Sequence, residues 1–369
     1  MALPSFSKIV VVMLENHGFS QIIGSSNAPY INTLVPSAAL FTNSHGGPDV
    51  LHPSFPNYLQ FFSGSAQGTT NDTCPPPGSP YSGANLASAV IAAGKTFAGY
   101  AEDSPTSRTT CGNTAKTYAG RHVPWVWFSN VPANDCLDFA TSWPTTASGY
   151  AALPTVSMVP PNLQHDMHSF GTETDAQTIQ MGDAWVKAHI DGYLQWAKAN
   201  NSLLIIQFDE SDSADNPIPT LFLGANVKPG SYSEHITHYN VLATLCALTG
   251  ATPMAGAVSA TTITDVWQAG GSTGAVPGTP TGLTVTAVTA TSVSLAWTAP
   301  TQGPVTGYNV YVNGTLAQSP TATSTTVAGL TAGTTYSLTV AAFNGNGSGT
   351  QTPAVQATTS SGGGGGPVP

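Results

Sequence analysis

Charged side chains occupy only the first part of this chain, and no other feature constrains its folding as much. All 26 charged residues, 8 basic and 18 acidic, lie at or before Asp265, and none occurs from 266 to 369. The sequence just after this boundary is rich in Gly, Ser, Thr and Pro, as flexible linkers are. A chain of 369 residues is also longer than one ordinary domain. We therefore predict two domains, each followed by a linker: a domain at 1–268, a linker at 269–280, a domain at 281–359 and a Gly-rich linker at 360–369.

The part without charges contains short segments in which apolar and polar residues alternate, at 283–288, 292–297, 307–312 and 335–343. A period of two, with turn residues between the segments, predicts an antiparallel β-sandwich. Trp297, Tyr308 and the run that ends in Tyr336 resemble the fibronectin type III family, in which the position of Tyr336 forms the tyrosine corner. The resemblance implies a spacer or binding module that contacts a cell surface or a polysaccharide.

Two runs in the first part, Ile9–Leu14 and Leu203–Phe208, are almost continuously apolar. Such runs are typical of parallel strands that are buried on both faces. Other segments have the pattern of a third, shorter strand and of three helices, at 220–224, 85–93, 176–198 and 238–249. Strands that alternate with helices predict an α/β sandwich.

Each apolar run is followed by side chains that can hold a cation, Glu15 and Asn16 after the first and Asp209 and Glu210 after the second. In open parallel sheets, ligands bind beyond the carboxyl ends of the strands. Buried carboxylates there are costly unless a cation or another partner compensates their charge. A single acid is explained as well by a cap on the following loop or helix. Two clusters at neighbouring strand ends instead predict an oxygen-rich site for a divalent ion.

A third motif, His52-Pro-Ser54-Phe-Pro-Asn57, lies between the two acidic clusters. Its prolines predict a turn, and the apolar run after Asn57 predicts a helix. A serine at this place lies where backbone N–H groups attract an anion. Its hydroxyl can attack phosphorus if a metal lowers the hydroxyl pKa. The alternative is a serine that only caps the helix.

Five motifs, taken in order along the chain, resemble the phosphoesterase family, which includes bacterial phospholipases C and acid phosphatases within the alkaline phosphatase superfamily. The motifs lie at 15–24, 52–58, 161–168, 208–211 and 238–242. The resemblance implies an alkaline-phosphatase-like α/β/α sandwich with a mainly parallel sheet.

The family also implies roles for individual residues of this sequence. Ser54 would be the nucleophile and form a phosphoseryl intermediate, and His168 and His238 would stabilise the phosphate or protonate the leaving oxygen. Asn57 would hold the phosphoryl oxygens, with His52 and Asp166 as further substrate-binding candidates. A divalent metal, or two as in distant members of the superfamily, would be held by four residues: Glu15, Asn16, Asp209 and Glu210.

The predicted function is hydrolysis of a phosphoric ester, either a small phosphate ester or a phospholipid head group. The short first domain favours an acid phosphatase that acts on phosphomonoesters, and a phospholipase C-like phosphodiesterase is the alternative. An alternative from another class is a non-catalytic protein that binds a surface or polysaccharide. A sulfatase is disfavoured because sulfatases usually carry a Cys/Ser-Xaa-Pro-Xaa-Arg motif, and Tyr58 stands at the position of its arginine.

Charge and hydropathy narrow the range of partners. A net charge of −10 argues against a nucleic-acid partner, whose phosphates need Lys and Arg. No apolar stretch reaches the roughly 18 residues of a membrane span. Only 7% of the residues are charged, which favours an exported protein whose signal peptide is absent from this sequence.

The remaining candidates are cysteines and histidines outside the motifs. Four cysteines allow three pairings, of which we prefer a Cys74–Cys111 bridge, with Cys246 as a buried free thiol. Four further histidines are predicted to be surface residues or hydrogen-bonded core residues: His45, His122, His189 and His235.

Overall fold

A computed structural model describes residues 3–76, 78–105, 117–168, 171–268, 276–303, 305–344 and 347–361. The chain forms two compact units, Met1–Gly271 and Ser272–Pro369. Most of the predicted linker at 269–280, most of the tail at 360–369, and Cys111 lie outside the described residues. The bridge between Cys74 and Cys111 therefore stays a prediction, whereas Cys246 is a buried free cysteine.

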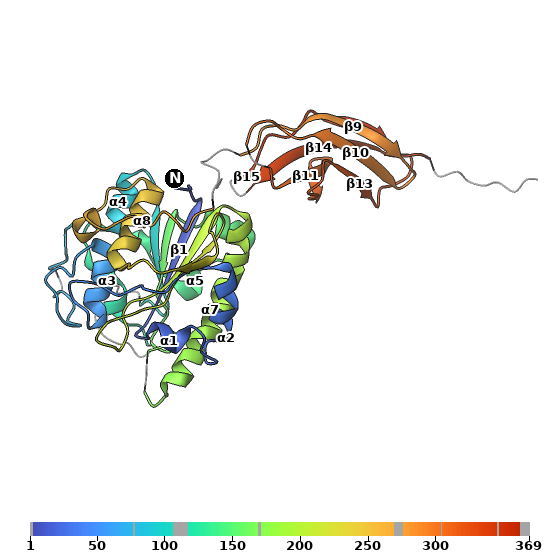
Figure 1. The fold of residues 1–369 in the computed structure, drawn as a ribbon. Coiled ribbons are helices and arrows are strands. Elements are labelled where there is room, and N and C mark those ends of the chain that lie inside the picture. The colour runs from blue at the N-terminus through green and yellow to red at the C-terminus, as the bar shows by residue number, and fades with distance from the viewer. Residues whose placement is uncertain are drawn as a thin grey trace, which may run out of the picture. The chain divides into compact units, whose positions relative to one another are not determined.

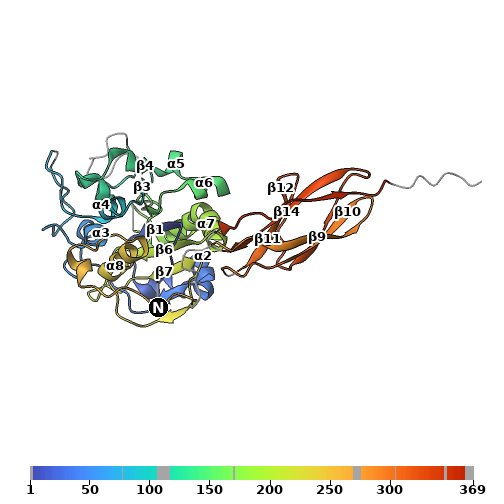
Figure 2. The same cartoon turned by 90° about the horizontal axis from the view of Figure 1, so that it is seen from above.

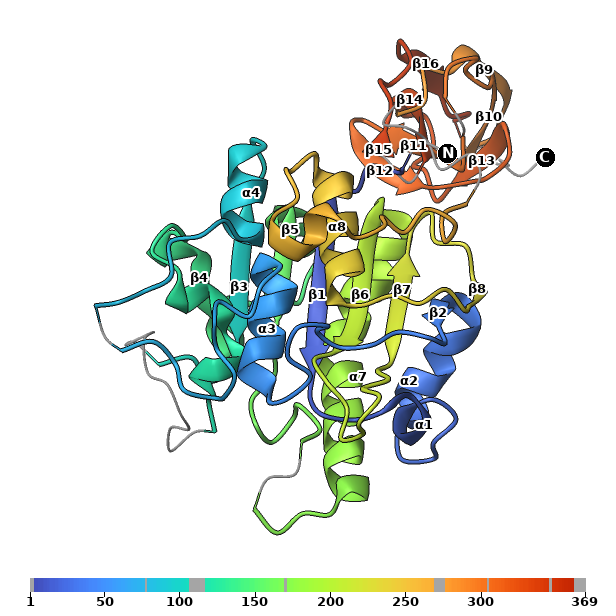
Figure 3. The ribbon, with the colours of Figure 1, turned by 60° about the vertical axis from the view of Figure 1, so that its left-hand side comes forward.

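The first unit contains an eight-stranded sheet in the order β4-β3-β5-β1-β6-β7-β2-β8 (Figure 3). The pairs from β4 to β6 are parallel, β7 is antiparallel to both its neighbours, and β2 pairs with β8 in parallel. The prediction of a mainly parallel sheet is thus confirmed, and the two antiparallel pairings of β7 make the sheet a mixed one. Its strands are β1 Lys8–Leu14, β2 Ala39–Phe41, β3 Phe97–Ala101, β4 Cys136–Asp138, β5 Val156–Val159, β6 Ser202–Phe208, β7 Thr220–Gly224 and β8 Gly230–Tyr232.

Helices cover both faces of this sheet (Figures 1 and 2). One face packs against α3, α4 and α8, and the other packs against α2, α5, α6 and α7. The α-helices are α1 Phe19–Ile22, α2 Pro29–Leu34, α3 Ser54–Ser63, α4 Leu86–Ala92, α5 Phe139–Ser142, α6 Ala147–Ala152, α7 Asp175–Ala199 and α8 His238–Thr249. Short 3₁₀ helices are η1 Val35–Ser37, η2 Gly120–His122, η3 Pro124–Trp127, η4 Ala133–Asp135 and η5 Ala255–Val258.

The central strand β1 shows why the apolar runs of the sequence form this architecture. Ile9, Val11 and Met13 belong to the core beneath α3 and α8, whereas the alternate residues Val10 and Val12 belong to the core beneath α7. Successive side chains of a strand point to opposite faces, so a strand between two helical layers must be apolar at every position. Polar residues can follow such a strand only where it ends.

The second unit is a β-sandwich with its own core around Trp297 and Tyr308, which confirms the prediction. The hydroxyl of Tyr336 accepts a hydrogen bond from the amide of Thr331 at 2.9 Å, the contact of a tyrosine corner. Its strands are β9 Thr281–Val288, β10 Ser292–Thr298, β11 Gly307–Val312, β12 Thr315–Gln318, β13 Ser324–Ala328, β14 Thr335–Asn344, β15 Gly347–Ser348 and β16 Val355–Thr358. Within the part of the chain that the structure describes, no helix is both long and apolar enough to cross a membrane.

Candidate active site

The two acidic clusters meet because β1 and β6 are parallel neighbours that end level with one another. Leu14 pairs with Phe208, so Glu15 and Asp209 leave the sheet side by side. The amide of Asn16 donates to Asp209 Oδ1 at 3.1 Å, and Asn16 takes a left-handed conformation with φ of 48°. Glu15, Asp209 and Glu210 are all buried. The predicted convergence of these side chains is therefore present in the structure.

Ser54 lies between two of these carboxylates. Its hydroxyl donates to Glu15 Oε2 at 2.8 Å and lies 3.3 Å from Glu210 Oε1. Ser54 is the first residue of α3, and Pro53 occupies the capping position in front of it. The hydroxyl is thus directed to the acidic cluster and does not cap the helix. This arrangement can take the hydroxyl proton when Ser54 acts as a nucleophile.

Asn57 and His52, both predicted to bind the substrate, contact the carboxylate of Glu210. Asn57 Nδ2 donates to Glu210 Oε2 at 3.1 Å, while its Oδ1 accepts from the amide of Gly47 at 2.7 Å. His52 Nδ1 lies 2.8 Å from the same Glu210 oxygen, on an imidazole that is 41% exposed. Both residues therefore fix the orientation of the Glu210 carboxylate beside Ser54.

His122 and Asp166 lie on the other side of Glu15. His122 Nε2 is 3.3 Å from Glu15 Oε1, and His122 Nδ1 is 3.6 Å from Asp166 Oδ2. The imidazole stacks on Tyr58 of α3, with the ring centroids 5.1 Å apart. Within the described residues, neither ring nitrogen has a hydrogen-bond partner. The prediction that His122 is a surface or hydrogen-bonded core residue is therefore wrong.

The cluster has an excess of buried negative charge. Burial raises the pKa values of Glu15, Asp166 and Asp209, and the charge of Glu15 raises the latter two further. Burial and repulsion by Glu15 together raise the pKa of Glu210 to about 8. The positive charges of Arg121 and His168 lower the pKa of Glu15 but do not offset the effect of its burial.

Several buried oxygens of this cluster also have unmet hydrogen-bonding capacity. Among the described residues, Glu15 Oε1, Asn16 Oδ1, Asp166 Oδ2 and Asp209 Oδ2 have no hydrogen-bond partner. Buried polar atoms almost always have partners, so a group of exceptions needs an explanation. A divalent cation supplies both the missing partner and the missing positive charge. The unmet oxygens of Glu15, Asn16 and Asp209 therefore fit the predicted metal, although Glu15, Asp209 and Glu210 do not bring three ligand atoms within 4.8 Å of one another.

The two predicted catalytic histidines differ in their surroundings. The amide of His168 donates to Asp166 Oδ1 at 2.9 Å. His168 is half-buried, and its charge lowers the pKa of Glu15. His238 is fully buried, which lowers its pKa to about 4. Its Nε2 donates to the carbonyl of Asp209 at 2.6 Å and its Nδ1 accepts from Gln207 Nε2 at 3.0 Å. A contact between His238 and phosphate would require one of these bonds to break.

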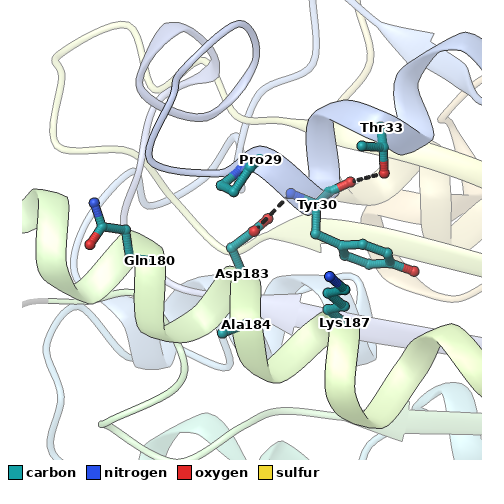
Figure 4. A pocket seen from close by; sticks show the side chains of 7 residues that line it. All are labelled: Pro29, Tyr30, Thr33, Gln180, Asp183, Ala184 and Lys187. Carbon is teal, nitrogen blue, oxygen red and sulfur yellow. Dashed lines mark hydrogen bonds between the residues drawn. The ribbon is translucent and has the colours of Figure 1, made fainter.

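A cavity of about 470 Å³ lies between α2 and α7, on the face of the sheet opposite α3 (Figures 3 and 4). Its Asp183 carboxylate accepts from the amides of Tyr30 and Ile31, each at 2.8 Å, and so caps α2. The Tyr30 hydroxyl donates to Asp191 at 2.7 Å. The polar groups of this cavity thus serve to join two helices. It is lined by Pro29, Tyr30, Thr33, Gln180, Asp183, Ala184 and Lys187.

Comparison with known proteins yields two family matches. The model of the phosphoesterase family matches residues 25–250, and that of the fibronectin type III domain matches residues 278–358. The first match begins after Glu15 and Asn16 and includes the other site residues described above.

Individual relatives match different shares of the chain. Phosphatidylinositol-3-phosphatase of Mycobacterium tuberculosis is 44% identical over 267 residues, which are 72% of this chain and 84% of that protein. Poly(3-hydroxybutyrate) depolymerase of Ralstonia pickettii is 47% identical over 102 residues, or 26% of this chain and 20% of that protein. Chitinase Chi52 of Paenibacillus xylanexedens is 49% identical over 75 residues, or 20% of this chain and 14% of that protein.

Proposed function

The chain belongs to the phosphoesterase family and hydrolyses phosphoric esters, and we propose that it is a metal-dependent phosphomonoesterase with Ser54 as its nucleophile. The observation that carries this proposal is the position of the Ser54 hydroxyl between Glu15 and Glu210. Family membership also removes the alternative of a non-catalytic binding protein.

Ser54 is placed to form and then release a covalent intermediate. As Ser54 Oγ bonds to phosphorus, its proton passes to Glu15 Oε2, which already accepts it at 2.8 Å. The bond from phosphorus to the ester oxygen breaks, and that oxygen takes a proton from His168. Water then attacks the phosphoseryl group, the bond from Oγ to phosphorus breaks, and inorganic phosphate leaves. Glu15 returns its proton to Ser54 Oγ, and His168 takes a proton from the attacking water, so that both groups are restored.

Glu15, Asn16, Asp209 and Glu210 are the residues that would hold a divalent cation beside Ser54. Their unmet oxygens and raised pKa values support this assignment. When bound, such a cation lowers the pKa of the serine hydroxyl and neutralises charge on the phosphoryl oxygens. His52 and Asn57 hold Glu210 in place, and His238 holds the backbone of Asp209.

A phosphomonoester on a lipid head group is the proposed substrate class. Support comes from the relative named phosphatidylinositol-3-phosphatase, which this chain matches over most of its own first unit. The phosphodiesterase alternative predicts the opposite preference, so a comparison of the two ester types separates them.

The test compares the wild type with Ser54→Ala on a chromogenic phosphomonoester, a phosphodiester and a phosphoinositide, with and without a chelator. Ser63→Ala is the matched control, since Ser63 is a buried serine of the same helix whose hydroxyl donates to backbone carbonyls. We expect Ser54→Ala to lose roughly a thousandfold or more in kcat, and Ser63→Ala to stay within about twofold. Full activity of Ser54→Ala would refute the assignment of Ser54 as the nucleophile. Activity that survives exhaustive chelation would refute the metal dependence.

The second unit is proposed to be an accessory module of an exported protein that contacts a polysaccharide or another polymer surface. Support comes from its lack of charged residues and from the short matches to a chitinase and a polyester depolymerase. Co-sedimentation of the full chain with chitin and cellulose tests the contact. Assay of the culture medium of the source organism for the protein tests the export.

A further inference from the structure

The two carboxylate oxygens of Glu15 face different groups of side chains. Oε2 accepts from the Ser54 hydroxyl at 2.8 Å, next to Glu210. Oε1 lies 3.3 Å from His122 Nε2 and has no hydrogen-bond partner among the described residues. A carboxylate whose oxygens face two separate sets of ligands has the geometry of a bridge between two cations.

We propose that this phosphoesterase has a second divalent-cation position, formed by Glu15, His122 and Asp166, with Glu15 shared between the two positions. The proposal rests on the metal-dependent function above and specifies how its site is built. One ligand atom from each of the three residues lies within 4.8 Å of the others. Among the described residues, this is the only group of three His, Cys, Asp or Glu side chains with such spacing.

The spacing of these atoms fits shared coordination better than direct hydrogen bonds. Nitrogen–oxygen hydrogen bonds are usually 2.7–3.2 Å long, whereas the two contacts of His122 measure 3.3 and 3.6 Å. Two ligands on one tetrahedral cation, each bound at roughly 2.1 Å, lie about 3.4 Å apart. Both ring nitrogens of His122 and Asp166 Oδ2 are also without hydrogen-bond partners within the described part of the chain.

Burial strengthens the case because water cannot easily satisfy these groups. The side chains of Glu15, His122 and Asp166 are all at least nine-tenths buried, with 1%, 3% and 0% exposed. Their positions are fixed from three directions: Glu15 follows β1, and its amide donates to the carbonyl of Asp166 at 2.7 Å. His122 ends η2 and stacks on Tyr58 of α3. The ligand set is thus preorganised by the fold.

The two positions differ in the chemistry of their ligands. The position beside Ser54 offers only oxygen, which suits Mg²⁺, Ca²⁺ or Mn²⁺. The second adds one imidazole to two carboxylates, and imidazole is a ligand that suits Zn²⁺ and other transition metals better than Mg²⁺. We therefore expect the second position to prefer Zn²⁺ or Co²⁺ over Mg²⁺.

The test measures bound metal on the full chain. Metal-free protein is dialysed against Zn²⁺ or Mn²⁺, and the ions bound per chain are counted by elemental analysis alongside calorimetric titration. We expect two ions in the wild type and in His189→Asn, an exposed histidine of α7 on the other face of the sheet. We expect one ion in His122→Asn at the concentration that saturates the wild type.

Cobalt gives a second, spectroscopic readout on the wild type and His122→Asn. Co²⁺ at a position with an imidazole ligand produces visible absorption bands, which should appear in the wild type and be lost in folded His122→Asn. One ion in the wild type, or equal metal content in the wild type and His122→Asn, would overturn the second position. Activity of Ser54→Ala tests the proposed function separately, because that variant should still bind two ions.

Discussion

Buried carboxylates occur at two places in the first unit, at Asp183 between α2 and α7 and around Ser54 beyond the ends of β1 and β6, and only those at the first place are satisfied, meaning fully hydrogen-bonded. Asp183, in the cavity between α2 and α7, accepts two backbone amides at 2.8 Å. Around Ser54, by contrast, Glu15, Asp166 and Asp209 each have an oxygen without a hydrogen-bond partner in the described chain. The cavity of about 470 Å³ is lined by Asp183 and thus belongs to the satisfied group. The comparison teaches that unmet polar atoms mark the functional site better than open space does.

The largest loss of activity is expected when one carboxylate of the unsatisfied group is neutralised. Glu15→Gln keeps the shape of the side chain but removes its charge, so we expect kcat to fall by roughly a thousandfold. Because Glu15 repels Asp166 and Asp209, the melting temperature of the metal-free variant should not fall. Steady-state kinetics and calorimetry measure the two effects. Near-normal activity would show that the unmet oxygen has no function.

The pH dependence of stability sharpens the same contrast. The pKa of Glu210 is raised from 4.5 to about 8 in the folded protein, so the folded state holds a proton that the unfolded state loses at lower pH. The unfolded state binds fewer protons between these values, and stability therefore falls as pH rises through this window. We expect the melting temperature of metal-free protein to fall between pH 5 and pH 8.

Added divalent metal should reverse that loss most strongly at the upper end of the window, since deprotonated carboxylates bind cations. Thermal denaturation with and without metal gives both curves. Metal-free protein whose melting temperature is constant or rises over this range would contradict the assignment of uncompensated charge to the site.

The satisfied group predicts the opposite behaviour. Asp183→Asn replaces an acceptor of two amides by a side chain with one carbonyl, so one amide of α2 loses its partner. We expect a loss of about 1–3 kcal/mol in the free energy of unfolding and no change in kcat beyond about twofold. Denaturant unfolding and kinetics measure these together. A large loss of kcat in a folded variant would give the cavity a function.

The smallest effect should come from the second unit. It has its own core, so removal of residues 276–369 leaves the core and the site of the first unit intact. We expect kcat/KM on a soluble phosphomonoester to stay within about twofold of the full chain. The full and the truncated chain are compared on a soluble substrate and on a polymer-associated substrate. A large loss on the soluble substrate would show that the two units act together in catalysis.

The sequence predicted the part of the site that follows from strand order. Glu15 and Asp209 each follow an apolar run, and neighbouring parallel strands must bring such ends together. Ser54 was identified because its motif predicts a turn that leads into a helix and resembles the nucleophile motif of the family, and α3 begins at Ser54 itself. These features depend on local pattern, which a sequence displays directly.

Residues placed by tertiary packing were beyond that reasoning. His122 lies in a short 3₁₀ turn without periodicity, and its stacking on Tyr58 brings it to Glu15. The start of α8 at His238 was predicted. The hydrogen bonds of both its ring nitrogens, to Asp209 and Gln207, were not. Similarly, the contact of Asn57 with Glu210 was not predicted, and its contact with the substrate stays a prediction. The partner of a side chain depends on rotamer and packing, which no motif specifies.

Acid-quench trapping of the covalent intermediate tests whether Ser54 is the nucleophile. Protein is mixed with a phosphomonoester, stopped with acid during turnover and analysed by peptide mass spectrometry. We expect one phosphoryl group on Ser54, and none on the same peptide of Ser54→Ala. A phosphoryl group on another residue, or turnover with Ser54 unmodified throughout, would contradict this expectation.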